Sequence, residues 1–198
     1  MKESKGKHRT KLRIQPDWRW ITSVFGATIG ISAAMSLVSN GLLSGSGIAV
    51  SFLILMVIIL LGIVFDIIGV AVTAAEERPF HSMAAKKVPE AKEALNMLRR
   101  ADRVSSFCND VVGDICGVIS GSASAVIATQ AVVGLQPLWA SAVQLLMSAV
   151  VAGLTVGGKA FGKSLAMQNA TAILHTAARL IYAVKSVPRR LAALIGRG

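Results

Sequence analysis

Charged side chains are missing from two long stretches of the 198-residue chain, residues 20–65 and 115–158. A soluble domain carries charge over its whole surface, so this absence excludes an ordinary water-soluble fold for most of the sequence. Hydrophobic residues make up 54% of the chain, and its mean hydropathy is +0.63. The sequence therefore predicts an integral membrane protein of one domain, with no soluble part larger than a loop.

Cysteine and histidine are scarce, which argues against covalent and zinc chemistry. The two cysteines, Cys108 and Cys116, lie eight residues apart on one expected helix and cannot form a disulfide with each other. His81 and His175 each lack a second ligand at zinc-site spacing. Because no paired nucleophile and base is found, we expect that the protein is not an enzyme.

The first apolar run lacks the small-residue pattern of a signal-peptide cleavage site, so we expect it to be kept as a membrane span.

Acidic residues are few: ten Asp and Glu stand against 21 Lys and Arg, for a net charge of +11. The basic residues form three blocks of seven, at 1–19, 78–103 and 159–198, separated by pairs of apolar runs. Under the positive-inside rule, all three blocks face the cytoplasm. The pattern predicts a multi-pass protein of the cell membrane with both termini in the cytoplasm. It does not favour a nucleic-acid partner, because basic blocks beside spans are an ordinary orientation signal.

Four apolar runs are long enough to cross a bilayer as helices, so the expected fold is an all-α membrane bundle. Two more helices are expected on its cytoplasmic side, an amphipathic connector and a C-terminal interfacial helix, both near anionic lipid headgroups. Asp66 and Gly69 mark an expected irregularity in the second run. A basic tail (1–19) precedes the spans, which are expected at 20–43, 48–75, 104–133 and 138–158, with the connector at 76–103 and the interfacial helix within 160–198.

Four ionisable residues fall inside these runs or at their ends: Asp66, Asp110, Asp114 and Lys159. An ionised group within a spanning helix costs roughly 2.5–3.5 kcal/mol on insertion scales, so each should face a polar cavity, a partner or an ion. Asp110 and Asp114 are four residues apart and should share a helix face. We expect one cavity near the cytoplasmic side in which Asp66, Asp110 and Lys159 converge, with Asp114 close behind.

Glycine recurs at helical spacing in two of the runs. Gly26 and Gly30 are one turn apart in the first, and Gly113, Gly117 and Gly121 form a row in the third. A face without side chains lets another backbone approach closely. We therefore expect a second helix to pack on each of these faces, and the glycine faces favour a homodimer.

Three stretches of the chain carry polar motifs in a fixed order: FDIIGVAVTAAEERPFHSMAAKKVPEAKEALNML (65–98), RVSSFCNDVVGDICG (103–117) and GKAFGKSLAMQN (158–169). In order and spacing they resemble the transmembrane domain of the CNNM/CorC family of magnesium transporters. The resemblance implies such a domain over residues 48–190, with an additional helix at 20–43 and a tail at 191–198. The paired CBS domains that follow the membrane domain in the family are not expected in this chain. The third stretch matches the family in register at Gly158, Lys163, Ser164, Leu165, Ala166 and Asn169.

The resemblance also implies a site for Mg²⁺ or another divalent cation, and a homodimer. In the family the ion is held by Ser and Asn groups and a Glu. By position, the family's Ser falls on Asp66, its two Asn fall on Asp110 and Asp114, and its Glu falls on Lys159. The implied metal ligands are Asp66, Asn109, Asp110 and Asp114, and the residues that line the site are Ser105, Ser106 and Lys159.

The residues leave the chemistry of this site open. Three carboxylates and one ammonium sum to −2, which suits one hard divalent cation, with Lys159 lowering its affinity or gating it. Alternatively, the ammonium takes the place of the ion in an internal salt bridge that locks the fold, or it extends to the membrane interface. The corresponding functions are a divalent-cation transporter and a non-transporting membrane scaffold or accessory subunit.

Overall fold

A computed structural model describes residues 17–43, 45–134 and 136–195, with side chains up to residue 186. Residues 1–16 of the expected basic tail and 196–198 of the expected C-terminal tail lie outside the described residues. Every element in the described ranges is a helix, as the sequence predicted. The elements are α1 (Trp18–Leu43), α2 (Ile48–Ala74), α3 (Arg78–Ala85), α4 (Ala91–Leu98), α5 (Ala101–Ser106), η1 (Phe107–Gly113), α6 (Asp114–Ala131), α7 (Pro137–Gln168) and α8 (Ala170–Ile195).

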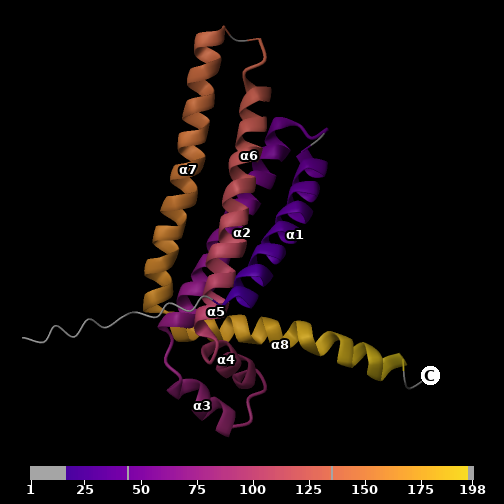
Figure 1. Cartoon of the computed structure of the whole chain (residues 1–198), viewed down its shortest axis with the longest axis vertical. Helices are drawn as coiled ribbons and strands as arrows, with labels where there is room; N and C mark the ends of the chain where they lie inside the picture. The colour runs from indigo at the N-terminus through magenta and orange to yellow at the C-terminus, as the bar shows by residue number, and fades with distance from the viewer. Residues whose placement is uncertain (1–16, 44, 135, 196–198) are drawn as a thin grey trace, which may run out of the picture.

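Four of the described helical segments are long and apolar enough to cross a membrane: Trp18–Leu43, Ile48–Ala74, Ala101–Ala131 and Pro137–Gln168. The third consists of α5, η1 and α6 in succession. The four segments stand upright beside one another, and α2 contacts each of the others (Figure 1). The prediction of four long apolar helices is confirmed to this extent.

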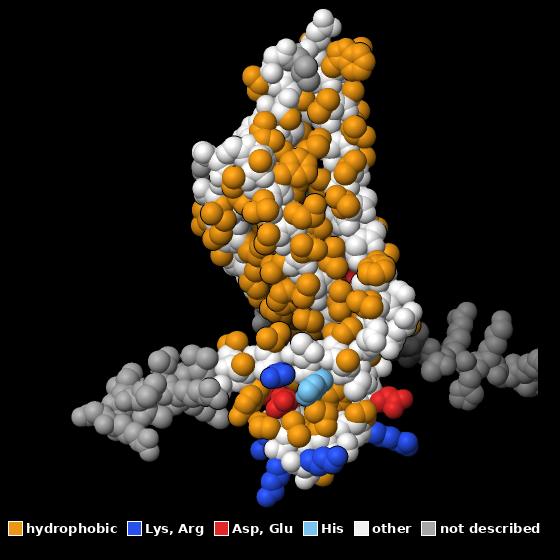
Figure 2. All heavy atoms as spheres, turned by 180° about the vertical axis from the view of Figure 1, so that it is seen from behind, with side chains coloured by type: hydrophobic (Ala, Val, Ile, Leu, Met, Phe, Trp, Pro, Cys, Tyr) orange, Lys and Arg blue, Asp and Glu red, His pale blue; other side chains and the backbone are white. Residues whose placement is uncertain are grey.

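The other three helices, α3, α4 and α8, gather at one end of the bundle, which we call the basal end (Figure 1). There α8 runs across the direction of the four upright helices. Figure 2 shows that most of the charged side chains visible on that face lie around the basal end, whereas the upright part is covered mainly by hydrophobic side chains. The molecule thus combines an apolar bundle with a charged base.

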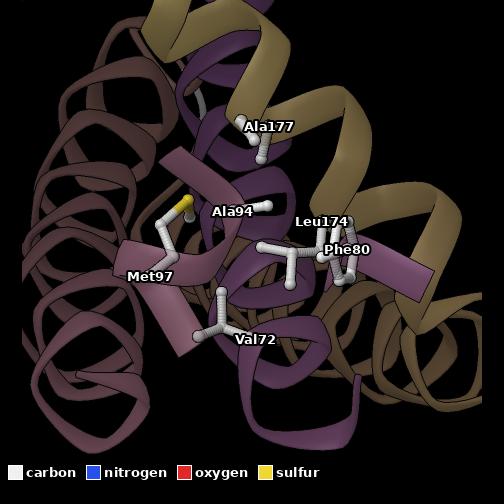
Figure 3. Close-up of a cluster of buried hydrophobic side chains, with 7 residues drawn as sticks. Val72, Phe80, Ala94, Met97, Leu174 and Ala177 are labelled. Carbon is white, nitrogen blue, oxygen red and sulfur yellow. The ribbon is translucent and has the colours of Figure 1, made fainter. Parts of the chain in front are cut away.

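The basal end has a hydrophobic core of its own, built from the ends of four helices (Figure 3). Phe80 and Leu174 are fully buried in it, and burying a side chain of this size stabilises the fold by about 1.5–3 kcal/mol. Since α2 contributes to this core and also carries Asp66, the core fixes the helix end nearest that residue. The core residues are Val72 on α2, Phe80 on α3, Ala94 and Met97 on α4, and Leu174, Ala177 and Ala178 on α8.

An ion pair and a second, longer contact between polar side chains join α8 to the connector. Lys185 Nζ lies 2.7 Å from Glu93 Oε2 on α4, and His175 Nε2 lies 3.6 Å from Glu90 Oε1 just before α4. His175 therefore faces the packed interior of the basal end, in agreement with a structural role. These contacts hold α8 against the connector.

The fourth long helix does not end at residue 158 as the sequence suggested, because α7 continues to Gln168. Gly158 and Gly162 lie where α7 crosses α2, and a methyl group on Gly162 would come within 2.7 Å of Ile67. With no helix breaker after residue 158 and continued packing on α2, the helix has no reason to stop. Lys159 is consequently an interior residue of α7, enclosed between two close-packed turns.

The irregularity expected in the second apolar run is in the third. α2 is an unbroken helix from Ile48 to Ala74, so the expectation of a break at Asp66 and Gly69 was wrong. The third segment instead contains a π-helix, Phe107–Gly113, between α5 and α6. Segments of π-helix are rare and often occur at functional sites.

Candidate functional site

Three ionisable side chains from three long helices meet toward the basal end. Lys159 Nζ on α7 lies 3.9 Å from Asp66 Oδ1 on α2 and 3.8 Å from Asp114 Oδ1 on α6. The side chain of Asp66 is 16% exposed and that of Lys159 is 25% exposed, whereas that of Asp114 is 71% exposed. The ammonium group thus lies between one largely enclosed carboxylate and one open carboxylate, and the three formal charges sum to −1.

The position of Lys159 depends on a missing side chain at the end of the π-helix. A methyl group on Gly113 would lie 3.3 Å from Lys159 Nζ, 3.4 Å from the Cys108 carbonyl oxygen and 3.9 Å from Asp66 Oδ1. Gly113 is itself buried. The glycine therefore leaves the space that the ammonium group occupies between α2 and α6.

Asn109 of the π-helix packs against α2 one turn beyond Asp66. Its side-chain amide lies so close to Gly69 that any side chain there would overlap it. Asn109 Nδ2 donates a hydrogen bond to Ser105 Oγ at 3.3 Å, while Asn109 Oδ1 is buried and finds no hydrogen-bond partner among the described residues. A buried carbonyl oxygen without a partner is unfavourable and is therefore a candidate ligand atom.

Asp110 and Ser106 do not join this cluster. Both line a separate hollow of about 370 Å³ between η1 and α1, together with Trp20, Phe25 and other residues of α1. Within the described part of the chain, the Asp110 carboxylate has no ion pair, in contrast to Asp66 and Asp114. The arrangement thus differs from the expected one: Asp114, and not Asp110, meets Lys159 and Asp66.

The π-helix explains why sequence spacing was misleading here. Two residues four apart share a face in a regular α-helix, and this was the basis for placing Asp110 beside Asp114. Asp110, however, lies inside the π-helix and Asp114 begins the α-helix that follows. The wider π-helical turn changes the angle between successive side chains, and the two carboxylates lie beside different neighbouring helices.

The glycine row of the third segment is close-packed only at its first member. A methyl group on Gly117 or Gly121 would meet no atom within 4 Å, and the same holds for Gly26 and Gly30 on α1. The expectation that another helix packs directly on these faces is not met within this single chain. Gly117 and Gly121 instead border a hollow of about 220 Å³ between α6 and α7, which is also lined by Ser120, Ser124, Ser148, Val151, Ala152, Thr155 and Val156.

The cysteines behave as small buried hydrophobic residues. Both Cys108 and Cys116 are free and buried. Cys116 packs against Gly62 of α2, where an added methyl group would come within 2.9 Å of its Cβ. Cys116 thus contributes a close contact between α2 and the third segment, next to the charged cluster.

The chemistry open to the cluster follows from its donors. Carboxylate oxygens are the ligands that Mg²⁺ and Ca²⁺ prefer, but here they already face an ammonium group. In the ranges that the structure describes, no three side chains of His, Cys, Asp or Glu are grouped to hold a metal ion. The cluster can therefore bind a cation in competition with Lys159, or it can remain a salt bridge.

Comparison with known proteins leaves the site to be interpreted from its geometry. No family model matches the chain, and neither curated proteins nor solved structures give a significant match.

Proposed function

We propose that the chain is a multi-pass membrane protein whose four long helices cross the bilayer. Their length and apolar composition support this, as does the placement of charge around the basal end. The basic residues of 78–103 and the described ones of 159–185 lie toward that end, so the positive-inside rule directs it to the cytoplasm. With four spans, we place both termini there too. α8 then lies along the inner leaflet, beside anionic lipid headgroups.

Single cysteines test this topology, because the two natural cysteines are buried. Cysteines at Ser46 and Gln136, beyond the far ends of the helices, should react in intact cells with a membrane-impermeant maleimide. A cysteine at Ser82 on α3 should react only after permeabilisation. Strong labelling at Ser82 in intact cells would contradict the orientation.

We further propose that the protein handles cations, most simply as a transporter, and that the cation competes with Lys159 for Asp66 and Asp114. The observation that carries this is the ammonium group within 4 Å of carboxylates from two other long helices. Ionisable residues at membrane depth are costly and mark ion pathways. The ammonium serves as a resident counter-ion that keeps the site occupied between cations.

The charge of the site favours exchange of one cation for the other. With Lys159 in place the cluster carries a formal charge of −1, and with Lys159 displaced by a divalent cation the two carboxylates are neutralised. A cation reaches the site from the side of Asp114, whose carboxylate is exposed. The unpartnered Asn109 Oδ1 lies beside Gly69, one turn beyond Asp66 on α2, and is a further oxygen that can serve as a ligand.

The likeness of the three motifs to the CNNM/CorC family supports the same class and makes Mg²⁺ the first cargo to test. Purified protein in proteoliposomes loaded with a Mg²⁺-sensitive dye should carry Mg²⁺ down an imposed gradient. Asp66→Asn should abolish this flux, because it removes the enclosed carboxylate. Lys163→Gln, which removes a charge one turn away on the exposed face of α7, is the matched control. Equal flux in the parent and in Asp66→Asn would reject the proposal.

The second candidate function is a non-transporting scaffold or accessory subunit. It is favoured by the fact that both carboxylates already contact Lys159. An internal salt bridge of this kind holds three helices together without any ion. In that case no Mg²⁺, Ca²⁺ or Na⁺ gradient should drive flux, and added cations should leave the melting temperature unchanged.

We also propose a homodimer formed through the open glycine face of α6. Gly117 and Gly121 leave room beside α6 and α7 for an element from a second copy, since small residues permit close helix approach. Gly117→Leu should then lower the dimer fraction measured by cross-linking in bilayers. An unchanged dimer fraction would place the interface elsewhere.

A further inference from the structure

The hollow between α1 and η1 combines features that the Lys159 cluster does not have. Its volume is about 370 Å³, within the range of small-molecule pockets. One wall carries Asp110 and Ser106, and the opposite wall carries Trp20, Phe25 and Thr28 of α1. A single carboxylate and two aromatic side chains thus line the same open space.

Asp110 has no cation of its own in the described part of the chain. Arg103, the cation nearest to it along the segment, stacks over the Trp20 ring at 5.1 Å and lies 3.7 Å from Asp17 Oδ2. Lys159 contacts Asp66 and Asp114 instead. In a spanning helix a carboxylate without a partner costs roughly 2.5–3.5 kcal/mol, so a bound cation would be stabilising.

The lining selects the kind of cation. A divalent metal ion needs six or more oxygen ligands, and this hollow offers one carboxylate beside apolar groups. An organic ammonium ion fits better, because aromatic faces attract a cation within about 6 Å. Arg103 already lies over the Trp20 ring, so the exposed Phe25 ring is the face left for the ligand cation. The rings can also cover an apolar body attached to the ammonium group.

The depth of the hollow suits an amphiphilic ligand. From Trp20 to Thr28 the α1 wall is about 12 Å long at the rise of an α-helix. Trp at the start of a spanning helix marks the membrane interface. The hollow therefore extends from the interface inward, which is where an amine with an apolar body would partition.

We propose that this hollow binds an organic ammonium ion carried on an apolar body, with Asp110 taking the charge and Trp20 and Phe25 taking the body. The ligand is either a soluble aromatic or aliphatic amine or the amine headgroup of a phospholipid, because both present the same chemistry. This site is separate from the Asp66 cluster and does not depend on the cation function proposed there.

Intrinsic fluorescence provides a direct measurement. The chain has three tryptophans, so Trp18→Phe and Trp139→Phe together leave Trp20 as the only one. Benzyltrimethylammonium titrated into this variant in nonionic detergent should change the Trp20 emission with saturation. Benzyl alcohol, which carries the same ring without the charge, should not saturate in the same range.

Variants assign the response to the hollow. In the Trp20-only background, Asp110→Asn should weaken binding by about tenfold, in keeping with loss of a charge contact in an apolar site. Asp110→Glu should retain binding, and Asp102→Asn, an exposed aspartate on α5, is the matched control. Asp66→Asn should also bind normally, which separates this site from the Lys159 cluster.

The source of the ligand is decided in nanodiscs. If it is a lipid headgroup, replacing part of the phosphatidylglycerol with phosphatidylethanolamine should shift Trp20 emission and weaken benzyltrimethylammonium binding. If it is a soluble amine, this replacement should have no effect. Both results support the ammonium site.

Three results would overturn it. The first is unchanged binding in folded Asp110→Asn, and the second is equal saturable binding of benzyl alcohol. The third applies if Asp110→Asn fails to fold: Phe25→Ala removes a ring that is 68% exposed and should leave the fold intact. Phe25→Ala should weaken binding several-fold, and unchanged binding in that variant would reject the site.

Discussion

Two aspartates, four residues apart on one helical segment, lie in opposite surroundings. Asp114 lies 3.8 Å from Lys159, where α2, α6 and α7 meet. Asp110 lines the hollow against α1 and has no ion pair among the described residues. The difference shows how one short π-helical segment can divide two similar side chains between two sites, of which only one holds a cation from the described part of the chain itself.

The largest expected effect on stability comes from removing the charge of Lys159. Lys159→Gln leaves two carboxylates facing each other without a counter-ion. Breaking a fully buried pair costs about 3–5 kcal/mol, and the partial exposure here reduces the expected loss of unfolding free energy to about 2–3 kcal/mol. Thermal and urea unfolding in detergent measure it. The unfolding free energy of Lys163→Gln should stay within about 0.5 kcal/mol of the parent, as it does for most surface changes. A similar loss in both variants would mean that the contacts of Lys159 in the cluster do not stabilise the fold.

A second, smaller effect tests what positions the π-helix. Gly69→Ala forces the Asn109 amide away from α2, and overpacking of this kind costs about 1–3 kcal/mol. Gly30→Ala on α1 is the matched control, because its methyl group meets no atom within 4 Å. It should be neutral or stabilising by up to about 1 kcal/mol, since Ala favours helix more than Gly. Equal stability of the two variants would mean that Asn109 does not depend on Gly69.

The smallest expected effect compares the two aspartates directly. Asp114→Asn removes an exposed ion pair with Lys159 and should lower the unfolding free energy by less than about 1 kcal/mol. Asp110→Asn removes no ion pair and should be neutral or slightly stabilising. Urea unfolding of the two variants side by side decides the sign. A larger loss for Asp110→Asn would show that Asp110 has a partner in the folded protein.

Much of the fold could be predicted from the distribution of charge. Long stretches without charge predicted the four apolar helices, and the basic blocks predicted where the charged base would lie. The end of the fourth helix was mispredicted, because a lysine was taken to mark a boundary. The helix continues past Lys159 because Gly158 and Gly162 pack against α2. This is a tertiary contact, which the local sequence does not reveal.

The site could be predicted only as a set of residues. Asp66, Asp114 and Lys159 were all named from their unusual positions in apolar runs, and they do meet. The place of Asp110 was not predictable from spacing, because a π-helix forms when packing favours it over the α-helix. The contacts involved, Asn109 on Gly69 and Lys159 over Gly113, join helices that are far apart in sequence.

The measurement that tests the central claim most directly is the effect of Mg²⁺ on the melting temperature of the parent and of Lys159→Gln, with Na⁺ at equal ionic strength as control. A ligand at 100 times its Kd stabilises the folded state by about 2.7 kcal/mol. We predict that Mg²⁺ raises the melting temperature of the parent. It should raise that of Lys159→Gln more, because the competing ammonium group is gone, and it should not change the melting temperature of Asp66→Asn. The absence of any Mg²⁺ effect on both the parent and Lys159→Gln would contradict a cation site at Asp66 and leave the salt bridge as the function of the cluster.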